Sequence, residues 1–424
     1  MSWQPLAPLP WEEPLAFAAR FSGRDLSFLY SALHERFSGD YSYLLVDPVE
    51  VVSGDGWDAL PTLPAEDDGL PLWVGYLGYG LRECAARGTP STIALPDFAL
   101  IRYAHLFRFH HPSQTLEAFS HDGTACDIPA AAKPASGSTA VRRLGSNLSR
   151  RAYESIVSDS IARIHKGDFY QANITRKFFG DFATTPDSWR IFSALTSASP
   201  APYSAYIRHG EAAILSSSPE CFLSVDAAGT ITTRPIKGSA RRSADAVEDE
   251  KIQQQLQTSA KNHAENLMIV DLMRNDLARV SDTGSVHVTE QSALYSYATI
   301  HHLISTIQSQ KRADISVYDV VRACFPAGSM TGAPKIAAME WCAAQEKIER
   351  GVYSGAIGWF GGGQRCDLSV VIRTLIIEGS RFEFQVGGGI VADSTPAEEW
   401  RETITKARGI LRALGLTEDD LAAI

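Results

Sequence analysis

YSGAIGWF from Tyr353, LSVVIRTLII from Leu368 and FEFQVGGGIV from Phe382 are the stretches that decide the fold class. Each run is rich in β-branched and aromatic residues, and the intervening GGG (361–363) and GS (379–380) are turn signals. Short turns of this kind join neighbouring strands of antiparallel sheets. The sequence therefore predicts an antiparallel meander near the end of the chain.

A second meander is predicted further upstream, between Tyr203 and Ser239, with a DAAG turn at 226–229. Helices are predicted from Ser149 until Gly167 stops the first, and over about 244–277 and 333–350. Because helices separate groups of strands and do not alternate with single strands, the fold class is α+β.

The segment 127–148 is the predicted linker, since DIPAAAKPASGSTA has almost no large apolar residue. It divides the chain into an N-terminal region, 1–126, of short strands and turns that packs on the core, and a larger region, 149–424. We expect the larger region to carry the functional site and to form one two-lobed unit.

Composition excludes several classes of protein. The chain of 424 residues is 45% hydrophobic with a net charge of -10 and no long basic run, which argues against nucleic-acid binding. It has no signal-peptide pattern and no apolar stretch long enough to span a membrane, so we expect a cytoplasmic protein. The six cysteines form no C-x-x-C pair, which argues against a disulfide framework and a structural zinc site.

The last helix carries a charged face. Thr395, Pro396 and Glu398 predict its start as a capping box with proline at the first position. Glu399, Glu402 and Lys406 then share one face. A solvated, salt-bridged surface would explain this face, but three glycines (387–389) end a strand just before it and permit close approach of a ligand.

Three further motifs carry possible chemistry. Glu265 lies on an apolar helix and needs a partner, which is either Arg274 or, together with Glu402, a magnesium ion. GSMTGAPK from Gly328 lacks the order of a nucleotide-binding loop but offers donors to an anion such as a carboxylate. Lys237 in RPIKGSARR is either a solvated charge or, with a lowered pKa, a nucleophile.

Nine motifs in order resemble those of the chorismate-utilising enzymes, which include anthranilate, aminodeoxychorismate, isochorismate and salicylate synthases. They are GDFYQANIT, SSSPECFL, RPIKGSARR, HAENLMIVDLMRNDLARV, HHLISTI, FPAGSMTGAPK, YSGAIGWF, VVIRTLI and GGGIVADSTPAEEWRETITKA. The resemblance is strong over about 149–408 and looser before it. It implies two large antiparallel sheets packed together, with helices outside and an active site between them.

The resemblance also implies a set of ligand contacts. Glu265 and Glu402 would bind Mg²⁺, with Glu399 nearby through water, and the metal would hold one carboxylate of chorismate. The other carboxylate would meet protein groups that include Arg373, whose planar guanidinium suits a carboxylate. The implied substrate contacts are Arg373, Tyr353, the backbone around Gly387, Lys406, Thr331, Gln171 and His302. His302 is equally well explained as a hydrogen-bonded core histidine.

Two positions imply which reaction is catalysed. Isochorismate and salicylate synthases carry a water-activating lysine where this chain has Gln171, and anthranilate synthases carry alanine where it has Lys237. The resemblance thus implies an aminodeoxychorismate synthase of the 4-aminobenzoate and folate route. Lys237 would add covalently to chorismate while Glu220 protonates the departing hydroxyl, and ammonia would then displace the lysine.

Ammonia needs a source, and no cysteine here lies in the G-x-C-x-G turn of a glutaminase. A separate glutamine amidotransferase is therefore the expected partner. Two alternatives remain: an anthranilate synthase component, and a non-catalytic protein that binds chorismate or another aromatic ligand. FLYSA from Phe28 stands where related enzymes often carry a tryptophan-binding segment, and the sequence leaves tryptophan binding and oligomeric state open.

Overall fold

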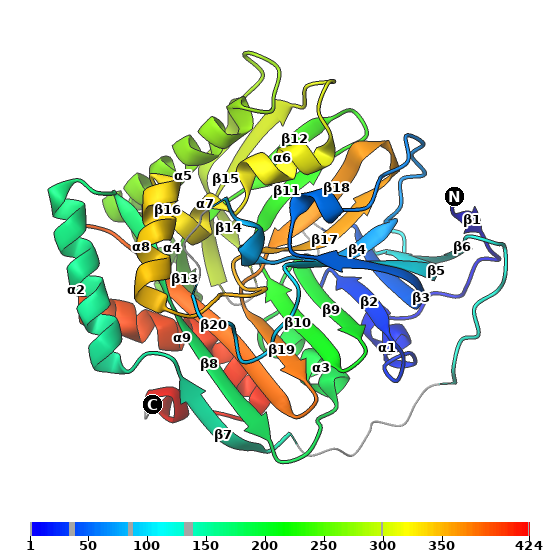
Figure 1. Cartoon of the computed structure of the whole chain (residues 1–424), viewed down its shortest axis with the longest axis horizontal. Helices are drawn as coiled ribbons and strands as arrows, with labels where there is room; N and C mark the ends of the chain where they lie inside the picture. Colours follow the sequence, from blue (N-terminus) through cyan, green and yellow to red (C-terminus); the bar gives the residue numbers. More distant parts are fainter. Residues whose placement is uncertain (1, 34–38, 84–87, 131–138, 298–299, 423) are drawn as a thin grey trace.

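The computed structural model describes residues 2–33, 39–83, 88–130, 139–297, 300–422 and 424. Its 20 named strands are joined into one hydrogen-bonded network, and every pairing between named strands of the described residues is antiparallel. Helices lie around the strands (Figure 1). The predicted α+β class is confirmed.

The strands form two layers that share a long bent hairpin. The first layer runs, in pairing order, through β7 (Val141–Ser146), β8 (Gln171–Phe182), β20 (Arg381–Ile390), β19 (Thr374–Glu378), β10 (Ala212–Ser218), β9 (Tyr203–His209) and β2 (Leu26–Tyr30). The second runs through β4 (Trp73–Leu77), β17 (Ala356–Gly361), β18 (Arg365–Val370), β11 (Cys221–Val225), β12 (Thr230–Arg234) with β13 (Ile236–Arg241), β15 (Ile300–Gln310) and β14 (His287–Ser296). The short strands β1 (Gln4–Pro5), β6 (Thr115–Ser120) and β16 (Gly332–Ala333) extend the edges.

The shared hairpin consists of β3 (Tyr41–Gly54) and β5 (Phe98–His110). One end of β3 pairs with β2 and one end of β5 pairs with β4, and the β3–β5 register shifts between Pro48 and Glu50. Apolar side chains of both layers form one buried cluster between them, including Ile214, Ile376, Val74 and Ile357. The strands of the N-terminal region thus connect the two layers.

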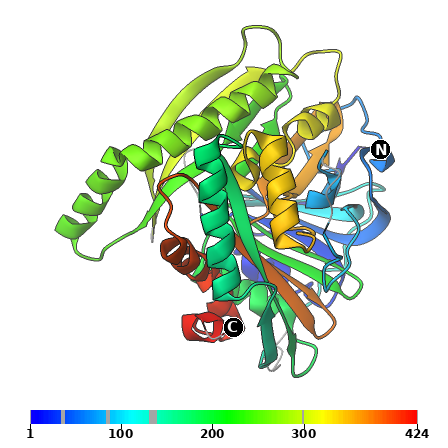
Figure 2. The same ribbon diagram turned by 60° about the vertical axis from the view of Figure 1, so that its left-hand side comes forward.

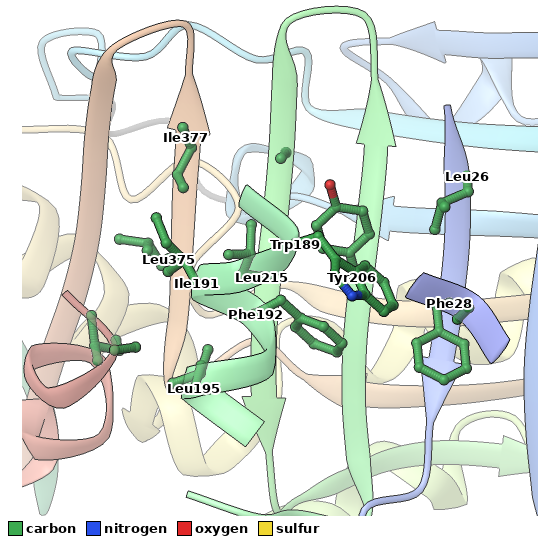
Figure 3. Close-up of a cluster of buried hydrophobic side chains, with 14 of the residues drawn as sticks. Leu26, Phe28, Trp189, Ile191, Phe192, Leu195, Tyr206, Leu215, Leu375 and Ile377 are labelled. Atoms are coloured by element: carbon green, nitrogen blue, oxygen red, sulfur yellow. The ribbon is translucent and has the colours of Figure 1, made fainter. Parts of the chain in front are cut away.

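Helices cover the outer faces. On the first layer lie α1 (Pro14–Ala19), α3 (Ser188–Ala198), α9 (Pro396–Leu414) and α10 (Glu418–Ala422), and Figure 3 shows side chains of α3 against those of the strands beneath it. On the second lie α5 (Ala260–Ala278) and α6 (Val317–Cys324). The helices α2 (Arg150–Lys166) and α8 (Lys335–Glu346) cover β8, as Figure 2 shows, and α4 (Ala246–Thr258) and α7 (Gly328–Thr331) complete the set.

Some predicted boundaries were wrong. The helix predicted over 244–277 is two helices, because Ser259 leaves helical geometry and caps α5. The helix predicted over 333–350 ends at Glu346, where Lys347 takes a left-handed φ of 58°. Proline does begin α9, but the Thr395 hydroxyl binds the Glu398 carboxylate at 2.6 Å and makes no backbone cap.

The predicted linker is partly a strand, since 141–146 form β7 against β8. Its residues 131–138 lie outside the described part of the chain, and the division at 126 and 149 stays a prediction. N-terminal strands pair directly with C-terminal ones, β2 with β9 and β4 with β17. In the described residues, no helix has the length and apolar character needed to cross a bilayer.

Candidate active site

Lys237 stands in a bulge of β13. The register between β13 and β15 shifts between Ile236 and Ser239, and Gly238 has a φ of 93°. A β-carbon at Gly238 would lie 3.2 Å from side-chain atoms of both Asn262 and Leu303. Glycine alone adopts this conformation easily, and a bulge redirects the side chain beside it. The local sequence IKGS therefore aims Lys237 out of the strand's regular alternation.

Several charges surround the Lys237 amino group. Burial lowers its pKa, and the nearby Lys406 cation lowers it further. Negative charges on Glu265, Glu220 and Glu402 oppose this shift. A lysine with a lowered pKa holds a larger fraction of neutral, nucleophilic amine near neutral pH.

Glu220 lies on the connection between β10 and β11, and only 5% of its surface is exposed. Burial raises the pKa of its carboxyl, while the Ser329 hydroxyl and the Lys237 cation act in the opposite direction. A carboxyl group with a raised pKa keeps its proton to a higher pH, as a general acid requires.

The three glycines 387–389 on β20 give close access to four functional groups. A β-carbon at Gly388 would stand 2.7 Å from Glu399 Oε2 and 3.7 Å from Glu402 Oε1. A β-carbon at Gly389 would stand 2.7 Å from Gln171 Nε2 and 3.3 Å from Lys237 Nζ. Alanine at Gly388 or Gly389 would therefore crowd these side chains, and the approach of a ligand to the glycine backbone stays a prediction.

Three carboxylates are candidate metal ligands. Glu399 is 5% exposed, its Oε1 accepts a hydrogen bond from Ser394 at 2.7 Å, and its Oε2 is buried with no protein partner. Burial raises the pKa of Glu399, and the charge of Glu402 adds to this. Glu265 lies 4.0 Å from Lys261 Nζ.

A divalent cation fits this donor set, because all the donors are oxygens and one of them is a buried orphan. The three ligand oxygens are not all within 4.8 Å of one another in the described structure. Two of the carboxylates lie next to lysines: Lys261 lies beside Glu265, and Lys406 Nζ lies 2.7 Å from Glu402 Oε1. Lys406 Nζ also donates to Gly387 O at 2.8 Å. Arg274, the alternative partner for Glu265, pairs with Asp271 at 3.4 Å.

Arg373 and His302 lie close enough for the charge of Arg373 to act on His302. Arg373 follows β18 with a left-handed φ of 51°, and burial lowers the pKa of its guanidinium while Glu220 opposes that shift. His302 is 2% exposed, and its Nδ1 lies 2.6 Å from Ser239 Oγ. Burial, with help from the Arg373 cation, lowers the pKa of His302 to about 3. His302 is thus a neutral, hydrogen-bonded ring within reach of Arg373's charge.

Comparison with known proteins identifies the family. The sequence pattern of the chorismate binding enzymes matches residues 43–412. The chain belongs to the chorismate binding enzyme family. It is 38% identical to an aminodeoxychorismate synthase component 1 of Klebsiella aerogenes over 84% of this chain and 78% of that protein.

The chain is also similar to anthranilate synthase components, which belong to the same family. An anthranilate synthase component 1 of Pseudomonas putida is 32% identical over 91% of this chain and 86% of its own. The crystal structure of anthranilate synthase component I from Streptococcus pneumoniae superposes with a TM-score of 0.77 at 26% identity, covering 89% of this chain and 93% of that one. The two-layer antiparallel fold is therefore the fold of this chorismate-binding family.

Tyr353 and Thr331 complete the predicted contacts. Tyr353 is 6% exposed, and burial raises the pKa of its phenol. Thr331 is fully buried, and its hydroxyl donates to Gly328 O at 3.3 Å. Electrostatic contacts link Tyr353 and Arg373 to Glu220, and Glu220 to Lys237. No direct contact recorded in the described residues links Thr331 to this group.

Sequence reasoning missed four residues at or beside this candidate site. Ser329 and Tyr297 face Glu220 and Arg373, and Lys261 faces the carboxylates. Arg350 donates to Met330 O and Asn173 O at 2.8 Å each, which ties the GSMT segment to β8. Lys261 could have been found as the i-4 neighbour of Glu265, whereas Arg350 lies in no recognisable pattern.

The lysine of GSMTGAPK has a structural contact. Lys335 Nζ lies 2.6 Å from Asp276 and donates to the carbonyls of Cys324 and Pro326. It therefore anchors α8 to α5 and to the segment before α7.

A separate cleft lies between the two layers beneath FLYSA. Tyr30, Ser31, Tyr203, Trp359 and Asp367 are among the residues that line it. Burial raises the pKa of Asp367 to about 6, and its Oδ1 has no protein partner.

Proposed function

We propose that this chain is the synthase component of an aminodeoxychorismate synthase, which converts chorismate and ammonia to 4-amino-4-deoxychorismate and water. The observation that carries the proposal is the position of the Lys237 amine, which lies at Gly389 together with Gln171 and in the electrostatic field of the Glu220 carboxyl. Burial lowers the pKa of Lys237 and raises the pKa of Glu220. A nucleophile and an acid shifted in opposite directions suit a displacement of hydroxide.

The first step forms a bond between Lys237 Nζ and the chorismate ring as the ring C–O bond breaks. Glu220 donates its proton to the departing oxygen, which leaves as water. Ammonia then attacks the ring as the C–N bond to the protonated Lys237 nitrogen breaks, so that Lys237 leaves as a neutral amine, and the new ring ammonium group returns a proton to the Glu220 carboxylate. Two displacements replace one difficult substitution.

Binding of the chorismate dianion is assigned to the groups around this pair. Arg373, Tyr353 and the backbone at Gly387 would receive one carboxylate, with Lys406 and Thr331 in support. Glu265 and Glu402, with Glu399 close by, would hold Mg²⁺, which supplies positive charge to the other carboxylate. The orphaned Oε2 of Glu399 supports a cation at this place.

Gln171 supports ammonia, and not water, as the nucleophile. Its side chain is fully buried, and neither of its amide atoms has a protein partner. A neutral amide cannot take a proton from water as a neutral lysine amine does. Ammonia would come from a separate glutamine amidotransferase, as the component naming of relatives suggests, and we expect the pair to work in the cytoplasm.

The experiment that tests this function identifies the product. Purified chain is incubated with chorismate, MgCl₂ and ammonium at mildly alkaline pH, and products are separated and identified by mass spectrometry. We expect aminodeoxychorismate with pyruvate retained. Anthranilate and free pyruvate would assign the chain to the anthranilate branch. No turnover, even with an amidotransferase and glutamine, would favour a non-catalytic binder.

A further inference from the structure

A cluster of three metal-binding side chains lies outside the active site. Asp47 is on β3, His105 is on β5, and Cys126 follows β6, so 79 residues separate the first from the last. One ligand atom from each residue lies within 4.8 Å of the other two. His105 Nδ1 is 3.0 Å from Asp47 Oδ2, and Cys126 Sγ is 3.9 Å from the same oxygen.

We propose that Asp47, His105 and Cys126 form a binding site for a zinc-class divalent metal ion. Nitrogen, sulfur and oxygen donors together suit Zn²⁺ and Co²⁺, whereas Mg²⁺ takes oxygens. Ligand atoms on one tetrahedral zinc lie roughly 3.3–3.8 Å apart, since the bonds are about 2.0–2.3 Å long. Small side-chain movements convert the observed spacing into this one.

The fold brings the three ligands together at the bend of the shared hairpin. Val46 pairs with His105 and Pro48 pairs with Tyr103, and Asp47 between them has a left-handed φ of 61°. This conformation departs from the regular alternation of the strand and lets the Asp47 carboxylate meet His105. Cys126 comes from the segment after β6, so a metal would fasten that segment to the hairpin.

Charge around the cluster also fits. Asp47 and a Cys126 thiolate would neutralise a divalent ion. The Asp47 carboxylate uses Oδ1 toward Arg24, at 3.7 Å, and Oδ2 toward the other ligands, while Arg24 is balanced by Asp127 at 3.5 Å. A carboxylate held this way is an oriented ligand. Asp47 remains 40% exposed, which gives the ion a route and leaves a position for water.

Metal binding has to remove the thiol proton, which passes to solvent. Without metal, burial and the Asp47 charge raise the pKa of the Cys126 thiol to about 12. Cys126 is a free cysteine like Cys221, Cys324, Cys342 and Cys366. These four are buried, so among the described cysteines Cys126 is the accessible one.

The test is a Co²⁺ titration of the full-length protein under a phosphine reductant, followed by near-ultraviolet absorption. We expect a thiolate-to-cobalt band that saturates at one equivalent, is displaced by Zn²⁺ and is unaffected by excess Mg²⁺. Cys126→Ala should abolish the band, and His105→Gln should weaken Co²⁺ binding at least about tenfold. Cys324→Ala and Glu402→Gln, which alter a buried thiol and the active-site carboxylates, should leave it unchanged.

Two results would overturn the proposal: absence of any thiolate band in the wild-type protein, or a band that persists in Cys126→Ala. Asp47→Asn provides a second variant should Cys126→Ala fold poorly. Its Co²⁺ affinity should also fall at least about tenfold, and an unchanged affinity would equally contradict the site.

Discussion

The Lys237 amino group and the Gln171 amide meet at the same glycine, Gly389: a β-carbon there would stand 3.3 Å from Lys237 Nζ and 2.7 Å from Gln171 Nε2. Lys237 reaches this point from a bulge in the second layer, and Gln171 from the first residue of β8 in the first layer. The proposed nucleophile and the residue proposed to exclude water activation therefore lie at one place, although they come from different layers.

Gly389→Ala should reduce activity while leaving the fold intact. The atoms nearest its methyl group would be the ends of two side chains, which can move, so the thermal midpoint should change little. The displaced Lys237 should lower kcat at least about tenfold, since small misplacements of reacting groups are costly. Gly23→Ala, where a β-carbon has no neighbour within 4 Å, is the matched control. Unchanged kcat in Gly389→Ala would contradict the placement.

Glu402→Gln should raise the Mg²⁺ concentration needed for half-maximal rate at least about tenfold, because it removes a charged ligand. Glu398→Gln on the same helix is the control, since Glu398 is exposed and binds the Thr395 hydroxyl. Rates measured across a Mg²⁺ series after chelator treatment distinguish the two. Equal Mg²⁺ requirements in both variants would remove Glu402 from the metal site.

Asp367→Asn should stabilise the protein at pH 8 and not at pH 4. Burial raises the pKa of Asp367 from 3.8 to about 6, so the folded state holds this proton more tightly than the unfolded state. Stability is therefore lost as pH rises from about 4 to 6 and stays lower above that range. Removing the charge should recover on the order of 3 kcal/mol at pH 8. Denaturant unfolding at both pH values measures the difference, and an equal effect at both would contradict the assignment.

Glu383→Gln should destabilise the fold by about 3 kcal/mol. Glu383 pairs with Lys177 at 3.1 Å, and both side chains are at most 2% exposed. It also accepts hydrogen bonds from Ser91 and Thr92, which holds the N-terminal region against β20. Glu378→Gln, in a more exposed pair with Arg381, should cost less than about 1 kcal/mol. Similar free energies of unfolding for the two variants would contradict the role of the buried pair.

Local patterns predicted much of the fold and of the site. The strands around 353–391 follow from short turns, and the common face of Glu399, Glu402 and Lys406 follows from helical spacing. The pairings of β2 with β9 and of β4 with β17 could not be predicted, because the paired strands lie far apart in sequence. Pairings of this kind depend on the whole fold and leave no local signal.

The same reason limits what the sequence says about the site. The sequence singled out Lys237 as a possible nucleophile, but the meeting of Lys237 with Gln171 depends on how two layers pack. The resemblance to a known family, and not the local sequence pattern, indicated that both residues belong to the site. The Asp47, His105 and Cys126 cluster had no such support, and its spacing in sequence matches no metal-binding pattern.

The most direct test of the account is intact-protein mass spectrometry after incubation with chorismate and Mg²⁺ but no ammonia. We predict an adduct with the mass of chorismate less one water, mapped by peptide analysis to Lys237, absent from Lys237→Ala and lost when ammonium is added. Aminodeoxychorismate formation by both wild type and Lys237→Ala at similar rates, with no adduct in either, would contradict the covalent role of Lys237.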